Sequence, residues 1–575
     1  MLQFTRKLFL SSLFVFISIS ACSKGFHPVH AKSAIVVSVQ EEASKVGIEI
    51  IRAGGNAVDA AVATGFALAV VHPAAGNLGG GGFMLFRRAN GEVHFLDFRE
   101  KAPHAASAKM YLDPEGRVTA DSRIGYRSVG VPGSVAGLVY AEKKWGKLTV
   151  AQVVEPAIRL AQAGVVLSYE EAQEMRDEGL ARFPESKRIF QRNGKFYEPG
   201  ELLQQPELAS TLKRIAKDPE EFYHGTMARE IAAAIQKGGG IISVEDLAGY
   251  QVVERPPILG TYRGLEILSA PPPSSGGVAL MEALNILEGY DLSSLGRNSA
   301  QAIHLTVEAY RRAFYDRATF MGDPDFAQIP VSQLIDKTYA KLWRQSIDSE
   351  KASLSKGLKR PTFGNLNQTA QARSPYDGPE SQNTTHYSVV DADGNAASVT
   401  TTLNDSFGSH VTLPGFGFLL NDEMDDFAAK PDEPNMFGLV QGPANAIAPG
   451  KRPLSTMTPT MVLRDGKLSL VLGSPGGPTI VTTVANVLMN VVDYGMDIQT
   501  AVNSARFHHQ WLPDEIQIEG WQLTPDTLRL LQEKGHKLKN LRSIGDGECI
   551  GIDLKTGERL GASDGRNNGV AVGLD

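Results

Sequence analysis

Cysteine is scarce in this sequence: only Cys22 and Cys549 occur among its 575 residues. Two cysteines cannot form the disulfide framework on which many small exported domains depend. Lysine and arginine form no run, and the net charge of −7 gives no electrostatic reason to expect a nucleic-acid partner. There is also no heptad series, low-complexity tract or internal repeat. The chain is long enough to bury a large core, as one large domain or several ordinary ones.

Residues 1–22 have the pattern of an export signal. A basic start is followed by an apolar stretch over 8–20 that is too short to be a transmembrane helix. The segment ends in Ile19-Ser20-Ala21-Cys22, which resembles a bacterial lipoprotein box, where the signal is cut before a cysteine that is then lipidated. An ordinary cleaved signal with a chance cysteine is the alternative. We expect an exported protein of the bacterial periplasm that is membrane-anchored through a lipidated Cys22.

The spacing of apolar residues predicts helices mixed with paired strands. Residues 41–53 form an amphipathic pattern that stops at Gly54-Gly55, and Asn56 can cap a second, almost wholly apolar helix over 57–71. A further long helix is predicted over 301–317. This mixture favours a layered α/β sandwich.

A β-hairpin is predicted about two-thirds of the way along the chain. Residues 385–390 read as a strand, and 396–403 as a return strand rich in Val and Thr. The intervening residues 391–395 have turn chemistry, with Asp393-Gly394 at the tip. A polar stretch over 353–382 lacks periodicity and precedes the hairpin as an exposed loop.

The loop length of this hairpin decides which side chains meet. If the loop has three residues, Ala392 pairs with Ala396, and Thr384 lies opposite Asn404 with Thr402 two positions back on the same face. A loop one residue longer or shorter would turn that face over.

Thr384 is the main candidate for a nucleophile. A hydroxyl is a weak nucleophile without a base, but an N-terminal threonine carries its own base as its α-amine. Thr384 would become N-terminal by attacking the Asn383 carbonyl, which forms an ester that water then opens. Taken alone, Thr384 is more simply read as a solvent-facing strand residue.

Three other features can supply parts of an acyl-transfer site. Ser474-Pro475-Gly476-Gly477 lies between a strand and a helix, where backbone N–H groups can stabilise an oxyanion. Arg99 can bind a carboxylate through two hydrogen bonds, and Glu423 and Asp426 can hold an ammonium group. A plain tight turn, a surface ion pair and a solvated acidic turn are the respective alternatives.

Other motifs carry less weight. Gly561-Ala562-Ser563-Asp564-Gly565 fits the G-x-S-x-G elbow, but no histidine and too little chain follow it. The glycines over 76–82 lack the lysine and spacing of a nucleotide loop. Adjacent His508-His509 cannot share one face of a helix or strand, so no metal site is predicted.

With these residues placed, the chain resembles the γ-glutamyltransferases (glutathione hydrolases) of the N-terminal-nucleophile hydrolase superfamily from about His27 to its end. The matching segments are His27-Pro-Val-His-Ala-Lys32, Ala53-Gly-Gly-Asn-Ala-Val-Asp-Ala-Ala61, Phe98-Arg99-Glu100, Pro271-Pro-Pro-Ser-Ser-Gly-Gly277, Thr384-Thr-His-Tyr387, Leu454-Ser455-Thr456-Met457, Ser474-Pro-Gly-Gly477 and Arg506-Phe-His-His-Gln-Trp-Leu-Pro513.

The resemblance implies the catalytic roles. Thr384 corresponds to the threonine that is both nucleophile and cleavage point, after Asn383. Thr402 corresponds to a second threonine that supports its α-amine and hydroxyl. Gly476 and Gly477 correspond to the oxyanion hole.

The resemblance also implies how the γ-glutamyl group is bound. Its α-carboxylate is gripped by an arginine that corresponds to Arg99, with help from Ser455 and from Thr456, where many members have a second serine. Its α-ammonium group is held by residues that correspond to Asn404, Glu423 and Asp426. A substrate lid corresponds to residues 431–442, in which Phe437 occupies the place of a gating tyrosine in some members.

The implied fold is α+β, a four-layer αββα sandwich. The implied organisation is a signal over 1–22, a large subunit over 23–383 and a small catalytic subunit over 384–575, which form a heterodimer with one shared core. The implied reaction moves a γ-glutamyl group from glutathione to water or to an amino acid or dipeptide, with no cofactor or metal. A cephalosporin-type acylase, a poly-γ-glutamate depolymerase and a non-catalytic envelope lipoprotein are the alternatives.

Overall fold

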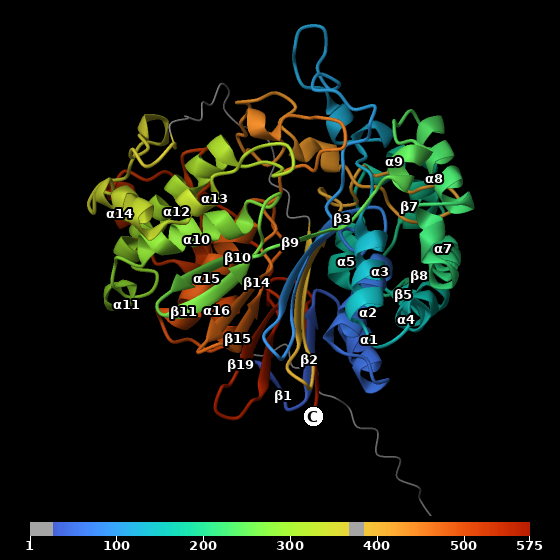
Figure 1. Ribbon diagram of the computed structural model, residues 1–575, viewed down its shortest axis with the longest axis horizontal. Coiled ribbons are helices and arrows are strands. Elements are labelled where there is room, and N and C mark those ends of the chain that lie inside the picture. Colours follow the sequence, from blue (N-terminus) through green and yellow to red (C-terminus); the bar gives the residue numbers. More distant parts are fainter. Residues whose placement is uncertain (1–26, 367–383) are drawn as a thin grey trace, which may run out of the picture.

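The computed structural model describes residues 27–366 and 384–575, and it has two seven-stranded sheets enclosed by helices (Figure 1). Neighbouring strands within both sheets are antiparallel. The first sheet has the order β1-β20-β19-β15-β14-β11-β10, and the second has the order β21-β2-β12-β13-β3-β4-β9.

The strands of the first sheet are β1 (Val29–Ala31), β10 (Ile258–Tyr262), β11 (Leu265–Ser269), β14 (Thr460–Arg464), β15 (Lys467–Leu472), β19 (Cys549–Ile552) and β20 (Arg559–Ala562). Those of the second are β2 (Ala34–Ser38), β3 (Gly81–Arg87), β4 (Val93–Asp97), β9 (Val253–Arg255), β12 (Thr385–Val390), β13 (Ala396–Thr402) and β21 (Val570–Leu574). Smaller sheets pair β5 (Val165–Val166) with β8 (Leu202–Leu203), β6 (Gln191–Arg192) with β7 (Lys195–Phe196), and β16 (Phe507–His508) with β17 (Ile516–Ile518) and β18 (Leu538–Asn540).

One group of helices lies on the side of the second sheet (Figure 1): α1 (Glu41–Arg52), α2 (Ala57–Val71), α3 (Ser134–Trp145), α4 (Val150–Ala163), α5 (Tyr169–Glu174), α6 (Pro184–Phe190), α7 (Pro206–Lys217), α8 (Thr226–Lys237) and α9 (Val244–Ala248). The other group lies on the side of the first sheet: α10 (Gly276–Leu287), α11 (Leu292–Leu295), α12 (Ala300–Phe320), α13 (Val331–Leu334), α14 (Lys337–Gln345), α15 (Thr479–Val492), α16 (Ile498–Asn503) and α17 (Pro525–Glu533).

Side chains that alternate between the two faces of each strand separate the cores of the molecule into layers. In β2, Val36 points into the core beneath α1 and α2, whereas Ile35 and Val37 point into a second core between the two sheets. Met461 and Val471 of the first sheet enter that same inter-sheet core. A third core lies between the first sheet and its own helices. The predicted four-layer αββα sandwich is therefore confirmed.

The apolar helix α2 follows the local sequence signals. The Asn56 side chain accepts hydrogen bonds from the N–H groups of Val58 and Asp59, and the Asp59 side chain accepts one from Asn56 N–H. All fifteen residues of α2 are buried, so it is a core helix. Among the described residues, no helix is long and apolar enough to cross a membrane.

The predicted hairpin is present as β12 and β13, but its register differs from the expectation. Thr385 pairs with Thr401 and Val390 with Ala396, so the loop has five residues, 391–395. Asp391 closes it, because its side chain accepts from Asn395 N–H at 2.9 Å. The prediction that Thr384 lies opposite Asn404 is wrong. Continuing the observed register places Thr384 beside Thr402, and the two-residue shift keeps the same face.

Residues on the two sides of position 383 are interleaved. β12 pairs with β2 and β13 pairs with β3, so the second sheet contains strands from both parts of the chain. Neither part could bury these strands alone.

Most of the predicted loop over 353–382, from residue 367 onward, lies outside the described residues, as do Asn383 and Cys22. Cys549 is a buried free thiol.

Candidate active site

A small cavity gathers most of the predicted site residues. Its lining comprises Arg99, Arg317, Thr384, Thr402, Asn404, Glu423, Asp426, Phe437, Leu439, Leu454, Ser455, Thr456, Met457, Gly477 and Ile480. Of the predicted residues that the structure describes, only Gly476 is not in this lining, and it adjoins Gly477.

Thr384 and Thr402 bring two hydroxyl groups together in this cavity. Their Oγ1 atoms lie 3.2 Å apart, and both residues are buried. The Asn404 N–H donates to Thr402 Oγ1 at 2.9 Å, which holds that hydroxyl in place. Asn404 has a left-handed backbone, with φ of 82°, so the chain leaves the strand there. Its side-chain amide turns toward the carbonyl of Asp422, at 3.2 Å.

Arg99 is a fully buried residue of the site and not a surface ion pair. It follows β4, and the Tyr250 hydroxyl donates to its carbonyl at 2.9 Å. Its guanidinium is paired with Glu423 and with Asp426, whose Oδ2 lies 2.5 Å from Nη2. These carboxylates belong to the 3₁₀ helix η6 (Glu423–Asp426), more than 300 positions away in the sequence. The acidic turn is therefore buried against an arginine, and a solvated turn is excluded.

Burial and the neighbouring charges shift the pKa values in this cluster. Burial acts to lower the pKa of Arg99, but the carboxylates of Glu423 and Asp426 outweigh it and raise that pKa above its ordinary value. Burial raises the pKa of Glu423 well above its usual range, against the opposing effect of Arg99. Burial also raises the pKa of Glu100 to about 7, although Arg99 lies 3.6 Å away and acts against it. Burial thus disfavours the ionised form of these carboxyl groups, and Arg99 partly offsets that effect.

The Ser474–Gly477 turn has the geometry for backbone N–H donation. Gly476 and Gly477 have φ of 128° and 53°, in the left-handed region that favours glycine. Neither N–H has an acceptor within hydrogen-bond distance among the described residues. α15 begins at Thr479, so its N-terminus adds a partial positive charge beside the two groups. The turn can therefore bind an anion that develops next to Thr384.

Ser455 and Thr456 border the cavity, but their hydroxyl groups have local partners. Ser455 Oγ accepts from Met457 N–H at 3.0 Å. Thr456 Oγ1 donates to the Gly477 carbonyl at 2.7 Å, which ties it to the glycine turn. The Ser455 hydroxyl can still donate its proton to a substrate, whereas the Thr456 hydroxyl donates to the glycine turn.

Arg317 is a further residue of the site that no sequence pattern indicates. The predicted helix ends at this residue, whereas α12 continues to Phe320 and Arg317 lines the cavity. Its Nε donates to Ser275 Oγ at 3.0 Å. Burial lowers its pKa to about 10, against the effect of Asp426. The only signal in the sequence was one more arginine in a helix that also carries Arg311 and Arg312, which does not single it out.

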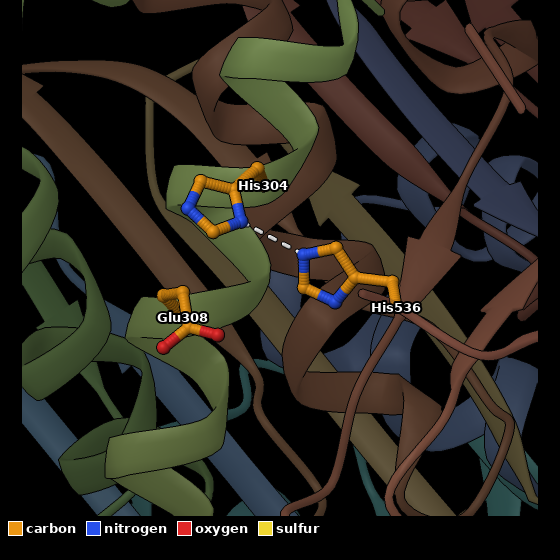
Figure 2. Close-up of side chains that lie close together, drawn as sticks. All are labelled: His304, Glu308 and His536. Carbon is orange, nitrogen blue, oxygen red and sulfur yellow. Dashed lines mark hydrogen bonds between the residues drawn. The ribbon is translucent and has the colours of Figure 1, made fainter. Parts of the chain in front are cut away.

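A cluster of possible metal ligands shares no residue with the cavity lining. Figure 2 shows its three side chains. His304 and Glu308 lie on α12, and His536 comes from the segment between α17 and β18. The histidine nitrogens share a 2.8 Å hydrogen bond. Glu308 is already paired with two buried arginines, Arg311 and Arg312. Those positive charges oppose a cation, so the cluster is a structural hydrogen-bond network.

The weaker motifs also have structural explanations. His508 and His509 point to different partners: His508 Nδ1 contacts Thr482 Oγ1 at 2.8 Å, while His509 Nδ1 accepts from Trp511 N–H at 3.1 Å. Ser563, in the elbow-like sequence, donates its hydroxyl to the Gly569 carbonyl at 2.8 Å.

Comparison with known proteins identifies the family. The profile of the family described as Gamma-glutamyltranspeptidase matches residues 43–574. The chain belongs to the gamma-glutamyltranspeptidase family. It is 48% identical over 547 residues to the "Glutathione hydrolase proenzyme" of Escherichia coli (strain K12), with 94% of this chain and 92% of the relative covered.

Two solved structures add to this family assignment. The gamma-glutamyltranspeptidase of Helicobacter pylori is 45% identical, with a TM-score of 0.56 over 57% of this chain and 95% of that one. The cephalosporin acylase of Bacillus halodurans is 27% identical, with a TM-score of 0.82 over 98% of this chain and 99% of that one. The predicted fold, enzyme class and family are confirmed.

Proposed function

We propose that this chain is a self-cleaving γ-glutamyltransferase and glutathione hydrolase in which Thr384 is both the cleavage point and the nucleophile. One observation carries the proposal. Thr384 Oγ1 lies 3.2 Å from Thr402 Oγ1 in the wall of a cavity that also contains Arg99, Asp426 and Gly477. These are a hydroxyl nucleophile, a carboxylate receptor, an ammonium receptor and an oxyanion donor around one small volume.

Maturation uses the same hydroxyl as catalysis. Thr384 Oγ attacks the carbonyl carbon of Asn383, the peptide C–N bond breaks, and the proton moves to the new α-amine. Water then hydrolyses the resulting ester, which leaves a carboxylate at Asn383 and a free hydroxyl on Thr384. The products are a large subunit ending at residue 383 and a small subunit of residues 384–575. The interleaved second sheet keeps them together as a heterodimer.

The substrate's amino-acid end fits the charges of the cavity. Arg99 takes the α-carboxylate of the γ-glutamyl group, with Ser455 and Thr456 beside it. Asn404, Glu423 and Asp426 take the α-ammonium. Binding therefore places the substrate's ammonium group among the buried carboxyl groups and its carboxylate beside the arginine, so each substrate charge meets the opposite charge.

Catalysis then proceeds in two steps. Thr384 Oγ attacks the γ-carbonyl carbon of glutathione, its proton passes through the α-amine to the leaving nitrogen, and Cys-Gly departs. The N–H groups of Gly476 and Gly477 stabilise the oxyanion of this step. Water or the amine of an amino acid or dipeptide then attacks the γ-glutamyl ester, which releases glutamate or a new γ-glutamyl amide. The chain's own groups supply every proton transfer in this scheme.

The likeness to a cephalosporin acylase keeps acylase activity as the second candidate. The acidic residues Glu423 and Asp426 favour the γ-glutamyl assignment, because a plain glutaryl group has no ammonium for them to bind. A poly-γ-glutamate depolymerase would bind the same γ-glutamyl end, so it stays a further alternative that only a polymer substrate would distinguish.

The decisive experiment compares two anilide substrates with the purified, cleaved enzyme. γ-Glutamyl anilide should turn over, faster in the presence of an acceptor dipeptide, and glutaryl anilide should turn over poorly. Preference for glutaryl anilide would instead support the acylase. No turnover of either by a fully cleaved protein would contradict both, and a single uncleaved band would support a non-catalytic lipoprotein.

For location, we propose export and a lipid anchor at Cys22.

A further inference from the structure

The segment over residues 431–442, called the lid here, closes one side of the cavity. Phe437 and Leu439 are part of the cavity lining. The Phe437 ring lies so close to Gly477 that a Cβ on that glycine would come within 3.2 Å of it. Because Phe437 has no hydroxyl, its side chain cannot fasten the lid by a hydrogen bond.

The lid is a small hairpin with its own internal bonds. Pro434 bridges to Val440, and the Asn435 side chain accepts from the N–H groups of Phe437 and Leu439, both at 3.1 Å. On the side of η6, the Gln441 side chain donates to the Asp426 carbonyl at 3.1 Å. These bonds shape the lid and hold its base, but they do not reach α15.

Gln510 supplies a tie on the side of α15. Its Nε2 donates to the Phe437 carbonyl at 3.0 Å, so it holds the backbone at the tip of the lid. Gln510 is 5% exposed, and an unmade bond there would leave a buried polar group unsatisfied. Its position in the sequence, after β16, is unrelated to the lid, and no local pattern indicates this contact.

The donor direction at Gln510 is determined by a chain of three hydrogen bonds. A carbonyl only accepts, so the amide nitrogen must face Phe437 and the amide oxygen must face His508. His508 Nε2 lies 2.9 Å from that oxygen and donates to it. His508 Nδ1 is then an acceptor for the Thr482 hydroxyl, at 2.8 Å. Thr482 lies in the first turn of α15, directly after the glycine turn.

We propose that Gln510 is a positioning residue that latches the lid over Thr384 and thereby controls donor retention and water entry. The hydrogen bonds of Gln510 and His508 connect Phe437, which lies against Gly477, to α15, which follows Gly477. Movement of the lid should therefore also affect the position of the Ser474–Gly477 turn. The inference rests on the proposed function, since it assigns Gln510 a role in the reaction at Thr384.

The test replaces Gln510 by Met, which has a similar length but no amide. Loss of one neutral hydrogen bond should lower the equilibrium constant for lid closure by about fivefold. KM for γ-glutamyl anilide should therefore rise by about that factor, with a smaller change in kcat. The share of hydrolysis relative to transfer should also rise. The control is Gln499→Met, because Gln499 is a buried amide that donates to the Ser563 carbonyl at 2.8 Å, away from the lid.

A double-mutant cycle separates a latch from a general loss of stability. Once Phe437→Ala has removed the covering ring, Gln510→Met should change KM by less than about twofold. Effects that multiply independently, or equal effects of Gln510→Met and Gln499→Met, would overturn the proposal. If Gln510→Met does not fold, Gln510→Glu keeps the size and the acceptor for His508 and should give the same result.

Limited proteolysis within residues 431–442 provides a readout that does not depend on activity. Gln510→Met should be cut there several times faster than the parent, whereas Gln499→Met should not. Unchanged cutting would contradict the latch. If the parent shows protease protection that depends on Gln510 but turns over no γ-glutamyl substrate, the proposed function fails and the latch stands as a structural contact.

Discussion

Thr384 and Thr402 face each other at the open end of the β12–β13 hairpin, with their hydroxyl oxygens 3.2 Å apart. Thr402 is held from behind, because its Oγ1 accepts the Asn404 N–H at 2.9 Å. One hydroxyl is thus positioned by the fold and can in turn position the other. A pair arranged in this way can restrain the rotamer of the Thr384 hydroxyl, the oxygen proposed to attack, before any substrate binds.

Replacing Thr384 should separate folding from self-cleavage. Thr384→Ala should give one folded, inactive chain, because the attacking oxygen is lost while the interleaved sheet remains. Thr384→Ser should still cleave, but more slowly, since it lacks the methyl group that restrains its rotamer. Intact mass and N-terminal sequencing of the small subunit check this. A small subunit that starts at another residue would contradict the nucleophile assignment.

Replacing Arg99 should weaken donor recognition. Arg99→Ala removes a charge-assisted pair with the α-carboxylate, so kcat/KM for γ-glutamyl anilide should fall more than tenfold, equivalent to roughly 2–4 kcal/mol, with self-cleavage intact. Arg99→Lys is the matched variant: it keeps the charge opposite Glu423 and Asp426 but loses the two-pronged geometry, and it should recover only part of the loss. Kinetics equal to the parent's in a fully cleaved Arg99→Ala enzyme would refute this role.

Replacing Gly477 should damage the oxyanion site more than the fold. Gly477→Ala places a methyl group 3.2 Å from the Phe437 ring at a φ of 53°, so the turn must move. The expected result is a fall in kcat on the order of 100-fold, as for loss of one oxyanion donor. Gly466→Ala is the control, because it has a similar φ of 73° but open space around its Cβ. Equal kcat values for the two variants would exclude a catalytic role.

Glu100 should make stability depend on pH. Its folded-state pKa is raised by burial from 4.5 to about 7. The folded protein therefore binds a proton that the unfolded chain releases, and this stabilisation is present below pH 4.5 and is lost as the pH rises through about 7. Across that window the free energy of unfolding of the parent should fall by up to roughly 3 kcal/mol. The Glu100→Gln variant should not show this fall, because its side chain does not titrate. Parallel plots of Tm against pH for the two proteins would contradict this.

Replacing Cys22 tests the proposed anchor. Cys22→Ala should move the protein from the membrane fraction to the soluble fraction without loss of activity, because the lipid attachment point is removed and the catalytic groups lie far along the chain. Cell fractionation followed by the anilide assay measures both properties. A parent protein found wholly in the soluble fraction would show that Cys22 carries no anchor.

Local sequence signals predicted the elements that carry the site. Asn56 was expected to cap an apolar helix, and it does so through both halves of a capping box. The strands around Asp393-Gly394 were also predicted within one or two residues, because their Val and Thr content and turn residues act locally. The order of the family's motifs predicted family membership, and the comparisons confirm it.

The pairing of those elements was decided only by the tertiary structure. Asp391 closes a five-residue loop where three residues were expected, which moved the partner of Thr384 from Asn404 to Thr402. A side-chain hydrogen bond can absorb two residues into a loop with no change in the strand pattern, so composition alone could not distinguish the registers.

The sequence by itself determined the family and the layered architecture and supplied the candidate residues for the chemistry, because caps, periodicity and motif order are local properties. Only the tertiary structure decided that Arg99 is buried against Glu423 and Asp426, that Arg317 reaches the cavity, and that Gln510 holds the lid. These contacts join residues far apart in the chain. They depend on how sheets and helices pack, which no short-range pattern encodes.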